Sequence, residues 1–204
     1  MSSSVDHTNA DSFVCIFLTH GDDDGLLYAY DGSVNLQELL DEFRGNKCRS
    51  LIGKPKIFII QACRGRELEV GVCETDGGIE DTDAKSAFGV ADALADAGTR
   101  TTLPAGADFI VCYSVVGGYF SFRDTVSGSW YIQALCQALA SYATNLEFTL
   151  LLTLVNRMVA EKCVKRSADP RMLGRKQMPC FVSMLTKQLM LTPKRYTGRR
   201  DIKK

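Results

Sequence analysis

A cysteine and a histidine in this chain have the types and the setting of a nucleophile and its base. Cys63 lies in the sequence Gln61–Gly65, directly after the apolar run Lys56–Ile60. The chain has two histidines, and His7 lies in a polar stretch, which leaves His20 as the plausible partner. An imidazole beside a thiol takes up its proton and later returns a proton to a leaving amine. The pair predicts covalent catalysis by a thiolate, and the alternative is a buried thiol with a structural histidine.

Two strands must bring these side chains together. Four runs rich in Val, Ile and Phe are expected to form buried strands: Ser12–Thr19, Lys56–Gln61, Ala107–Ser114 and Cys180–Leu185. His20 follows the first run and Cys63 the second. Because parallel strands end at one edge of an α/β sheet, where such sheets bind ligands, the two side chains are expected within reach of each other. Gly21 lets the backbone approach a substrate, so its N–H and that of Cys63 could form an oxyanion hole.

Three segments carry helical patterns between and after these strands. In the first, Val34–Phe43, Asn35 and Glu38 are spaced as a capping box. Trp130–Tyr142 and Glu147–Val164 each gather their apolar residues on one face. Strands that alternate with helices predict an α/β fold with a mostly parallel central sheet flanked by helices.

The composition favours a single domain whose specificity comes from a local site. The chain has 204 residues, of which 46% are hydrophobic, enough for one substantial core. Its 24 basic and 24 acidic residues create no overall field, so neither nucleic acid nor a membrane is an expected partner. The apolar stretch Leu146–Val159 contains Glu147, Asn156 and Arg157 and falls short of a membrane span. Residues 1–12 are too polar for a secretory signal, so a cytoplasmic location is expected.

The eight cysteines form no metal or redox pattern, so no metal or other cofactor is expected. There is no CxxC pair, and no histidine is near enough in sequence to complete a zinc site. Four cysteines lie in apolar runs and are expected in the core as small hydrophobic residues: Cys15, Cys112, Cys136 and Cys180.

One long segment interrupts the pattern of strands and helices. Residues 66–102 are rich in Gly, Ala and Asp and far longer than a usual loop. We expect a flexible linker there, joining a part at 12–65, which follows a polar leader at 1–11, to a part at 103–192. Residues 193–204 form a basic tail, for which simple solvation is favoured over a role as a nuclear import signal.

Four motifs resemble those of the caspases and occur in the same order: Phe17–Gly21, Gly53–Lys56, Gln61–Gly65 and Gly128–Trp130. Three longer runs are similar to the lamin-cleaving branch of the effector caspases: Thr102–Phe109, Ser129–Gln133 and Leu152–Arg157. The resemblance implies a caspase-like three-layer sandwich that lacks the family's N-terminal strand and helix segment. It also implies a cysteine endopeptidase that matures from a zymogen and cleaves proteins after aspartate in apoptosis.

The resemblance further implies how the aspartate is bound. In this family two arginines and a glutamine hold the carboxylate of P1, the substrate residue before the cleaved bond. Gln61 and Arg123 match two of these three residues. The other arginine belongs to the N-terminal segment and has no counterpart here, which would weaken substrate binding.

The remaining subsites follow from the same resemblance. Tyr119, Phe120 and Phe122 are expected to line S2, Ser121 to lie beside P1, and Trp130 to form a wall of S4. Asp124 would repel an acidic residue at P4, so an aliphatic P4 residue is expected.

Processing at aspartate and dimer formation complete the implied picture. Asp96 is the first candidate for cleavage between the large and small parts, followed by Asp76 and Asp92. The expected partners are proteins with a P1 aspartate and a second copy of the chain, joined through the last strand. The alternative function is a catalytically impaired short form that dimerises with full-length caspases and regulates them.

Overall fold

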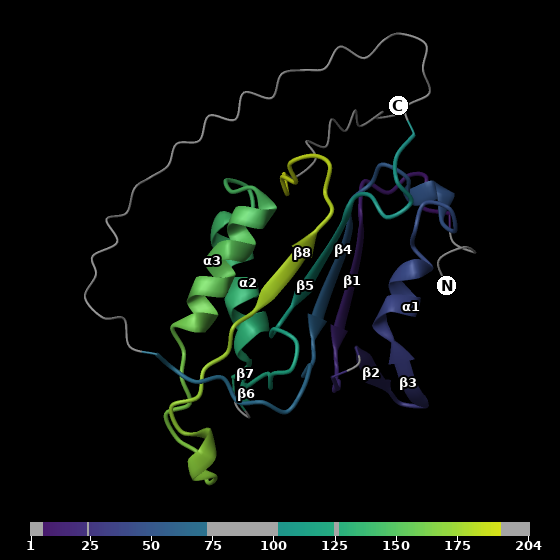
Figure 1. The fold of residues 1–204 in the computed structure, drawn as a ribbon. Helices are drawn as coiled ribbons and strands as arrows, with labels where there is room; N and C mark the ends of the chain where they lie inside the picture. Colours follow the sequence, from purple (N-terminus) through teal and green to yellow (C-terminus); the bar gives the residue numbers. More distant parts are fainter. Residues whose placement is uncertain (1–5, 24, 73–101, 125–126, 193–204) are drawn as a thin grey trace, which may run out of the picture.

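A four-stranded sheet lies at the centre of the molecule (Figure 1). The structure is a computed structural model that describes residues 6–23, 25–72, 102–124 and 127–192. The strand order is β1 (Phe13–Leu18), β4 (Lys56–Gln61), β5 (Phe109–Tyr113) and β8 (Cys180–Ser183). The first three strands are parallel, and β8 runs antiparallel to β5. The mostly parallel sheet predicted from the sequence is confirmed, with strand ends that differ by up to two residues.

Helices cover both faces of this sheet, because alternate residues of the central strands point to opposite sides. On one side, Ile57 and Ile59 of β4 pack with the apolar faces of α2 (Trp130–Tyr142) and α3 (Phe148–Ala160). On the other side, Phe58 and Ile60 pack with α1 (Leu36–Asp41). The result is the expected three-layer α/β sandwich, with the two helical layers on opposite sides of the sheet (Figure 1).

Two of the helices, α1 and α3, begin at a residue whose side chain caps the helix. The Asn35 side chain accepts hydrogen bonds from the backbone N–H groups of Gln37 and Glu38, at 2.8 and 3.2 Å. Glu147 caps α3 in the same manner through Thr149 and Leu150. α2 has the predicted bounds, but α3 ends at Ala160 and not at Val164 as predicted. No helix in the described part of the chain is long and apolar enough to cross a membrane.

The prediction that α3 continues to Val164 is wrong, because backbone hydrogen bonds to residues 174 and 175 override the apolar pattern of the segment. The Val164 N–H donates to the Arg175 carbonyl at 3.0 Å, and its own carbonyl accepts from the Gly174 N–H at 2.9 Å. These two bonds hold Val164 in an extended segment. The chain therefore leaves the helix a turn early and forms a loop around the 3₁₀ helix η2 (Pro170–Met172).

Several short elements were not predicted from the sequence. They are the hairpin of β2 (Leu26–Ala29) and β3 (Gly32–Asn35), the hairpin of β6 (Arg123–Asp124) and β7 (Gly128–Ser129), and the 3₁₀ helix η1 (Arg49–Leu51). Strands of two to four residues are too short to show a periodic pattern. Glu67 and Glu69 also form bridges, with Tyr119 and Lys176, so the start of the expected linker is paired with the rest of the domain.

The expected burial of cysteines holds for Cys112, which is fully buried, and is wrong for Cys136. Cys136 is exposed on α2, because the residues that this helix buries are Tyr131, Ala134, Leu135 and Ala138. Cys15 and Cys180 are half-buried. Cys136 lies to one side of this buried face, at a position on the helix that is turned toward solvent.

Candidate active site

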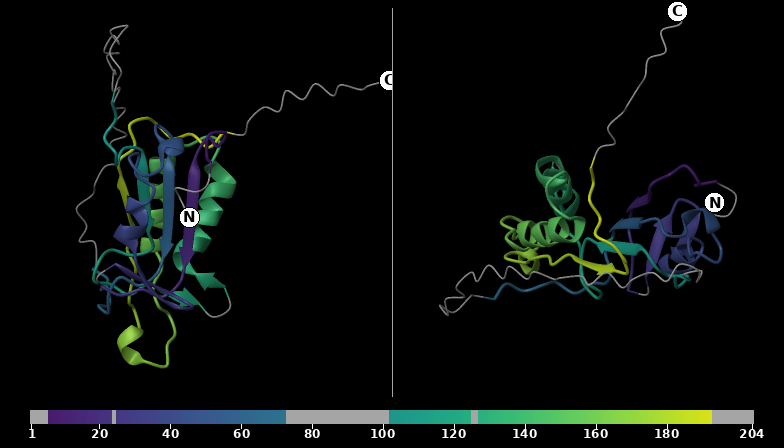
Figure 2. Two further views of the ribbon diagram at one scale, coloured as in Figure 1. Left: turned by 90° about the vertical axis from the view of Figure 1, so that its right-hand side faces the viewer. Right: turned by 90° about the horizontal axis from the view of Figure 1, so that it is seen from above.

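The pairing of β1 with β4 brings His20 and Cys63 to the same edge of the sheet. Leu18 lies opposite Gln61 in this parallel pair, and the Thr19 N–H donates to the Gln61 carbonyl at 3.0 Å. His20 and Cys63 each follow two residues later. Both strands point toward the edge where the yellow-green loop containing η2 lies (Figure 2). The two residues thus meet at the carboxyl ends of adjacent parallel strands, as predicted.

Gly21 fixes the distance between the two segments. A Cβ atom at this position would lie 2.6 Å from the Cys63 carbonyl oxygen and 3.0 Å from that of Leu26. Atoms of this kind do not approach so closely, so a residue with a side chain would push the segments apart. The backbone after His20 is therefore packed directly against the backbone of Cys63.

The residues after Cys63 are held by a second chain segment. The Arg64 N–H donates to the Tyr119 carbonyl at 3.1 Å, and the Gly118 N–H donates to the Arg64 carbonyl at 2.6 Å. The guanidinium of Arg64 lies 4.0 Å from the centre of the Tyr113 ring, a cation–π contact. A Cβ at Gly65 would come within 2.1 Å of the Gly118 carbonyl oxygen. The loop that carries the thiol is consequently rigid.

A cleft of about 1180 Å³ opens beside this thiol. Nine of the predicted site residues line it: His20, Gln61, Cys63, Phe120, Ser121, Phe122, Arg123, Asp124 and Trp130. Cys63 is half-buried, with its Sγ 3.9 Å from the Ser121 carbonyl oxygen, and His20 is exposed. Gly21 and Tyr119 are not among the residues that line the cleft. Asp76, Asp92 and Asp96 lie outside the described residues.

A chain of hydrogen bonds positions the Gln61 side chain. Its Nε2 donates to the Ser121 Oγ at 2.8 Å, Ser121 donates to the Ser114 Oγ at 3.0 Å, and Ser114 donates to the Ala62 carbonyl at 3.1 Å. The Gln61 Oε1 is buried without a hydrogen-bond partner in the described part of the molecule. A buried amide with spare hydrogen-bonding capacity is suited to a polar group of a ligand.

Two residues of this network were missed in the sequence analysis. Ser114 is fully buried, and Gln177 is 1% exposed. Gln177 accepts from the Phe122 N–H and donates to the Ser114 carbonyl, both at 2.7 Å. It thereby fixes the shape of the segment between Ser114 and Phe122. The only signal for either residue was a polar side chain next to an apolar run, which is too common to be informative.

Aromatic side chains form the wall next to Arg123. The rings of Phe122 and Trp130 have centroids 5.0 Å apart, and Phe120 meets Phe122 edge to face at 5.5 Å. The β6–β7 hairpin places Arg123 opposite Ser129 and leaves the Arg123 side chain exposed. The cleft combines an apolar wall with a cation, an arrangement that suits an extended peptide carrying one carboxylate.

Another part of the cleft lining was also missed. It consists of residues of the segment after α3, together with η2: Cys163, Val164, Lys165, Arg166, Ser167 and Met172. The predicted helix ran to Val164, and that prediction did not indicate that these residues line a cleft. Across the described residues, no group of three or more His, Cys, Asp or Glu side chains is placed to hold a metal ion.

A thiol and an imidazole beside a peptide-sized cleft define a cysteine endopeptidase, and comparison with known proteins identifies the family. Residues 1–190 match the Caspase domain model. Caspase-6 of Mus musculus is 52% identical over 192 residues, which cover 94% of this chain and 68% of that protein. Caspase-3 of Mesocricetus auratus is 47% identical over 188 residues, or 92% of this chain and 62% of that protein.

A solved structure agrees with these relatives. Caspase-1 from Spodoptera frugiperda has a TM-score of 0.80 and 35% identity, and the match covers 95% of this chain and 68% of that one. The chain therefore belongs to the caspase family, and its similarity to caspase-6 and caspase-3 places it with the effector caspases, which are cysteine endopeptidases. Caspases cleave proteins after aspartate and function as dimers. The chain spans 62 to 68% of the length of these three proteins.

Proposed function

We propose that this chain hydrolyses proteins after aspartate, with Cys63 as the nucleophile and His20 as the base. The observation that carries the proposal is the β1–β4 register, which places both residues at one edge of the sheet beside a cleft. His20 takes the proton of the Cys63 thiol, and the thiolate attacks the carbonyl carbon of the P1 residue. His20 then protonates the leaving amine, and water hydrolyses the acyl-enzyme.

The oxyanion is assigned to two backbone N–H groups, those of Gly21 and Cys63. The close packing of these two segments supports the assignment, because it keeps both amides near the reacting carbonyl. Preorganised donors of this kind stabilise the tetrahedral intermediate without having to reorganise during the reaction.

Arg123 and Gln61 are proposed to bind the P1 carboxylate. The guanidinium of Arg123 offers paired donors to a carboxylate, and the Ser121–Ser114 chain orients the Gln61 amide in the same cleft. Neutral residues of similar shape, such as asparagine, would leave the guanidinium without a counter-charge. The pair therefore favours aspartate at P1.

The exposed edge of the sheet suggests how the chain assembles. β8 forms one edge of the sheet and exposes Val182 and, just after the strand, Met184, which supports pairing with a second copy of the chain or with a full-length caspase. Residues 12–65 and 103–192 would then form the large and small parts, released by cleavage at Asp96, Asp76 or Asp92.

The proposal is tested by hydrolysis of three fluorogenic tetrapeptides that differ only in Asp, Glu or Asn at P1. We expect turnover of the Asp peptide alone, and its loss in Cys63→Ala. The matched control is Cys136→Ala, which removes an exposed thiol away from the cleft. Equal turnover of the Asp and Asn peptides would contradict the assignment of Arg123. Absence of turnover together with binding to a full-length caspase would favour the regulatory alternative.

A further inference from the structure

The cleft wall formed by the segment after α3 carries two cations that the catalytic proposal does not use. Lys165 and Arg166 both line the cleft, and both are exposed. The other fully charged groups of the lining are Arg123 and Asp124, and His20 and the thiols of Cys63 and Cys163 complete its titratable groups. Among the described residues that line the cleft, three cations stand against one carboxylate, so this lining is positive in a chain whose net charge is zero.

The packing of the two long helices determines where these cations lie. α2 and α3 are joined by a short connection and pack against each other, so the end of α3 lies next to the start of α2. Trp130 is the first residue of α2, and Lys165 follows the end of α3 by five residues. The two cations therefore follow the end of α3 that lies next to Trp130, and they line the same cleft as Trp130.

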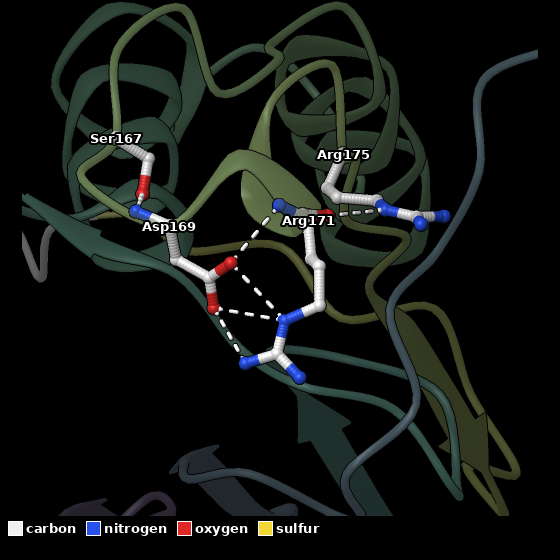
Figure 3. Close-up of polar contacts among 4 residues, drawn as sticks. All are labelled: Ser167, Asp169, Arg171 and Arg175. Atoms are coloured by element: carbon white, nitrogen blue, oxygen red, sulfur yellow. Dashed lines mark hydrogen bonds and ion pairs between the residues drawn. The ribbon is translucent and has the colours of Figure 1, made fainter.

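A set of polar contacts gives this segment a defined shape (Figure 3). Val164 is fixed by its two backbone bonds to residues 174 and 175. On the far side of Arg166, the Ser167 Oγ accepts from the Asp169 N–H at 3.1 Å, and the Asp169 carboxylate pairs with the Arg171 guanidinium at 2.8 Å. Arg175 donates from its Nε to the Arg171 carbonyl at 2.8 Å. The cations are thus presented from a segment that is held on both sides.

Asp124, the one carboxylate of the lining, is already engaged elsewhere. Its Oδ1 accepts from the backbone N–H of Ser127 at 2.7 Å and from the Ser127 hydroxyl at 3.0 Å. These bonds hold its charge within the β6–β7 turn. The aliphatic P4 preference expected from Asp124 alone did not take account of Lys165 and Arg166.

We propose that Lys165 and Arg166 are specificity-determining residues that select an acidic side chain at P4 of the substrate, next to Trp130. This inference rests on the proposed function, because it assumes that a peptide with P1 at Arg123 occupies the cleft. A carboxylate there gains two nearby cations of the protein and loses little hydration, since both side chains are exposed. The same residues would not distinguish between neutral side chains.

The experiment compares two fluorogenic tetrapeptides that share P3 to P1 and carry Asp or Asn at P4, a pair that differs in charge and hardly in shape. We expect kcat/KM to be about fivefold higher for the Asp peptide, the effect of exposed charge pairs. The ratio of kcat/KM for the Asp peptide to kcat/KM for the Asn peptide is expected to fall below one in the double variant Lys165→Glu/Arg166→Glu. It also approaches one as the salt concentration rises, because exposed charges are screened.

The matched control is Arg49→Glu/Lys187→Glu, which makes the same charge change at two exposed residues that do not line the cleft. We expect it to retain the wild-type ratio. Hydrolysis of both peptides with a ratio near one, or a ratio that the cleft variant leaves unchanged, would overturn the inference and leave the proposed function intact.

Absence of turnover would count against the proposed function alone. In that case a binding measurement tests the selection of an acidic P4 residue. The Cys63→Ala protein is titrated with dye-labelled versions of the two peptides, and binding is followed by fluorescence anisotropy. Tighter binding of the Asp peptide, lost in the Lys165→Glu/Arg166→Glu background, supports the selection of an acidic P4 residue. Equal affinities for the two peptides overturn it.

Discussion

Two glycines hold Cys63, the proposed nucleophile, in place, because no other residue fits beside the backbone at either position. A Cβ at Gly21 would lie 2.6 Å from the carbonyl oxygen of Cys63, and a Cβ at Gly65 would lie 2.1 Å from that of Gly118. Both contacts are with backbone atoms, which cannot rotate away as a flexible side chain does. The Cys63 loop is therefore positioned before a substrate arrives, which is where much of the catalytic advantage of an enzyme originates.

Gly21→Ala is expected to displace Cys63 relative to His20. Misplacement of a reacting group by about 1 Å can lower a rate about 100-fold, and we expect a loss of kcat/KM of that order. The matched control is Gly106→Ala, where the nearest atom to an added Cβ is 4.0 Å away. Hydrolysis of the P1-Asp tetrapeptide measures the effect, and wild-type kcat/KM in Gly21→Ala would contradict the packing argument.

Ser114→Ala tests whether the buried hydroxyl chain orients Gln61. The change removes the acceptor of Ser121 and leaves a buried hydroxyl without its partner, which costs about 1 to 3 kcal/mol. Because Gln61 is proposed to bind substrate and takes no part in bond cleavage, we expect KM to rise at least fivefold while kcat changes little. Ser33→Ala, at an exposed serine of β3, is the control. A fall in kcat with an unchanged KM would show that Ser114 acts elsewhere.

At the scale of elements, the sequence was most informative where a segment is long and buried on one side. α2 and β4 have the predicted bounds, and the apolar face predicted for α3 is the one that is buried. The short hairpins could not be predicted because strands of two to four residues show no periodic pattern, and the loop around η2 could not be predicted because its shape depends on backbone pairing of Val164 with residues 174 and 175. This limit affected the site itself. His20 and Cys63, which follow predicted strands, were identified from the sequence. Ser114, Gln177 and the Lys165–Arg166 pair were not.

The cap of α3 makes a prediction about pH. Partial burial tends to raise the pKa of Glu147, but hydrogen bonds from Thr149 and from the N–H groups of Leu189, Thr149 and Leu150 outweigh it and hold the pKa below 4.5. The ionised form therefore stabilises the folded state. This contribution is complete above the unfolded-state pKa and disappears as the pH falls through the folded-state pKa.

Glu147→Gln is accordingly expected to lower the free energy of unfolding by about 1 kcal/mol at neutral pH, the usual value of a helix cap. The difference from the wild type should vanish under acidic conditions, where Glu147 is protonated. Urea titrations at several pH values measure it, with Glu38→Gln in the first turn of α1 as the comparison. A deficit that persists at low pH would indicate a packing defect and not the loss of a charge.

At the scale of the whole molecule, burial in the fold makes three of the thiols poorly reactive. Burial raises the pKa of Cys112 to about 12 and also raises the pKa values of Cys15 and Cys180. These three thiols stay protonated at neutral pH and are poor nucleophiles. Cys63, in contrast, is half-buried in a cleft that His20 also lines. The layered sandwich thus provides both the core and the selectivity of the chemistry.

The most direct test of the Cys63–His20 pair is covalent labelling by a peptidyl chloromethyl ketone that ends in aspartate. Attack by a thiolate forms a thioether and releases chloride, and peptide mapping by mass spectrometry locates the label among the eight cysteines. We predict one label, on Cys63, formed at least about 100-fold more slowly in His20→Ala, as expected when a general base is removed. His7→Ala, the control, should react as the wild type does. Labelling of another cysteine, or an unchanged rate in His20→Ala, would contradict the account.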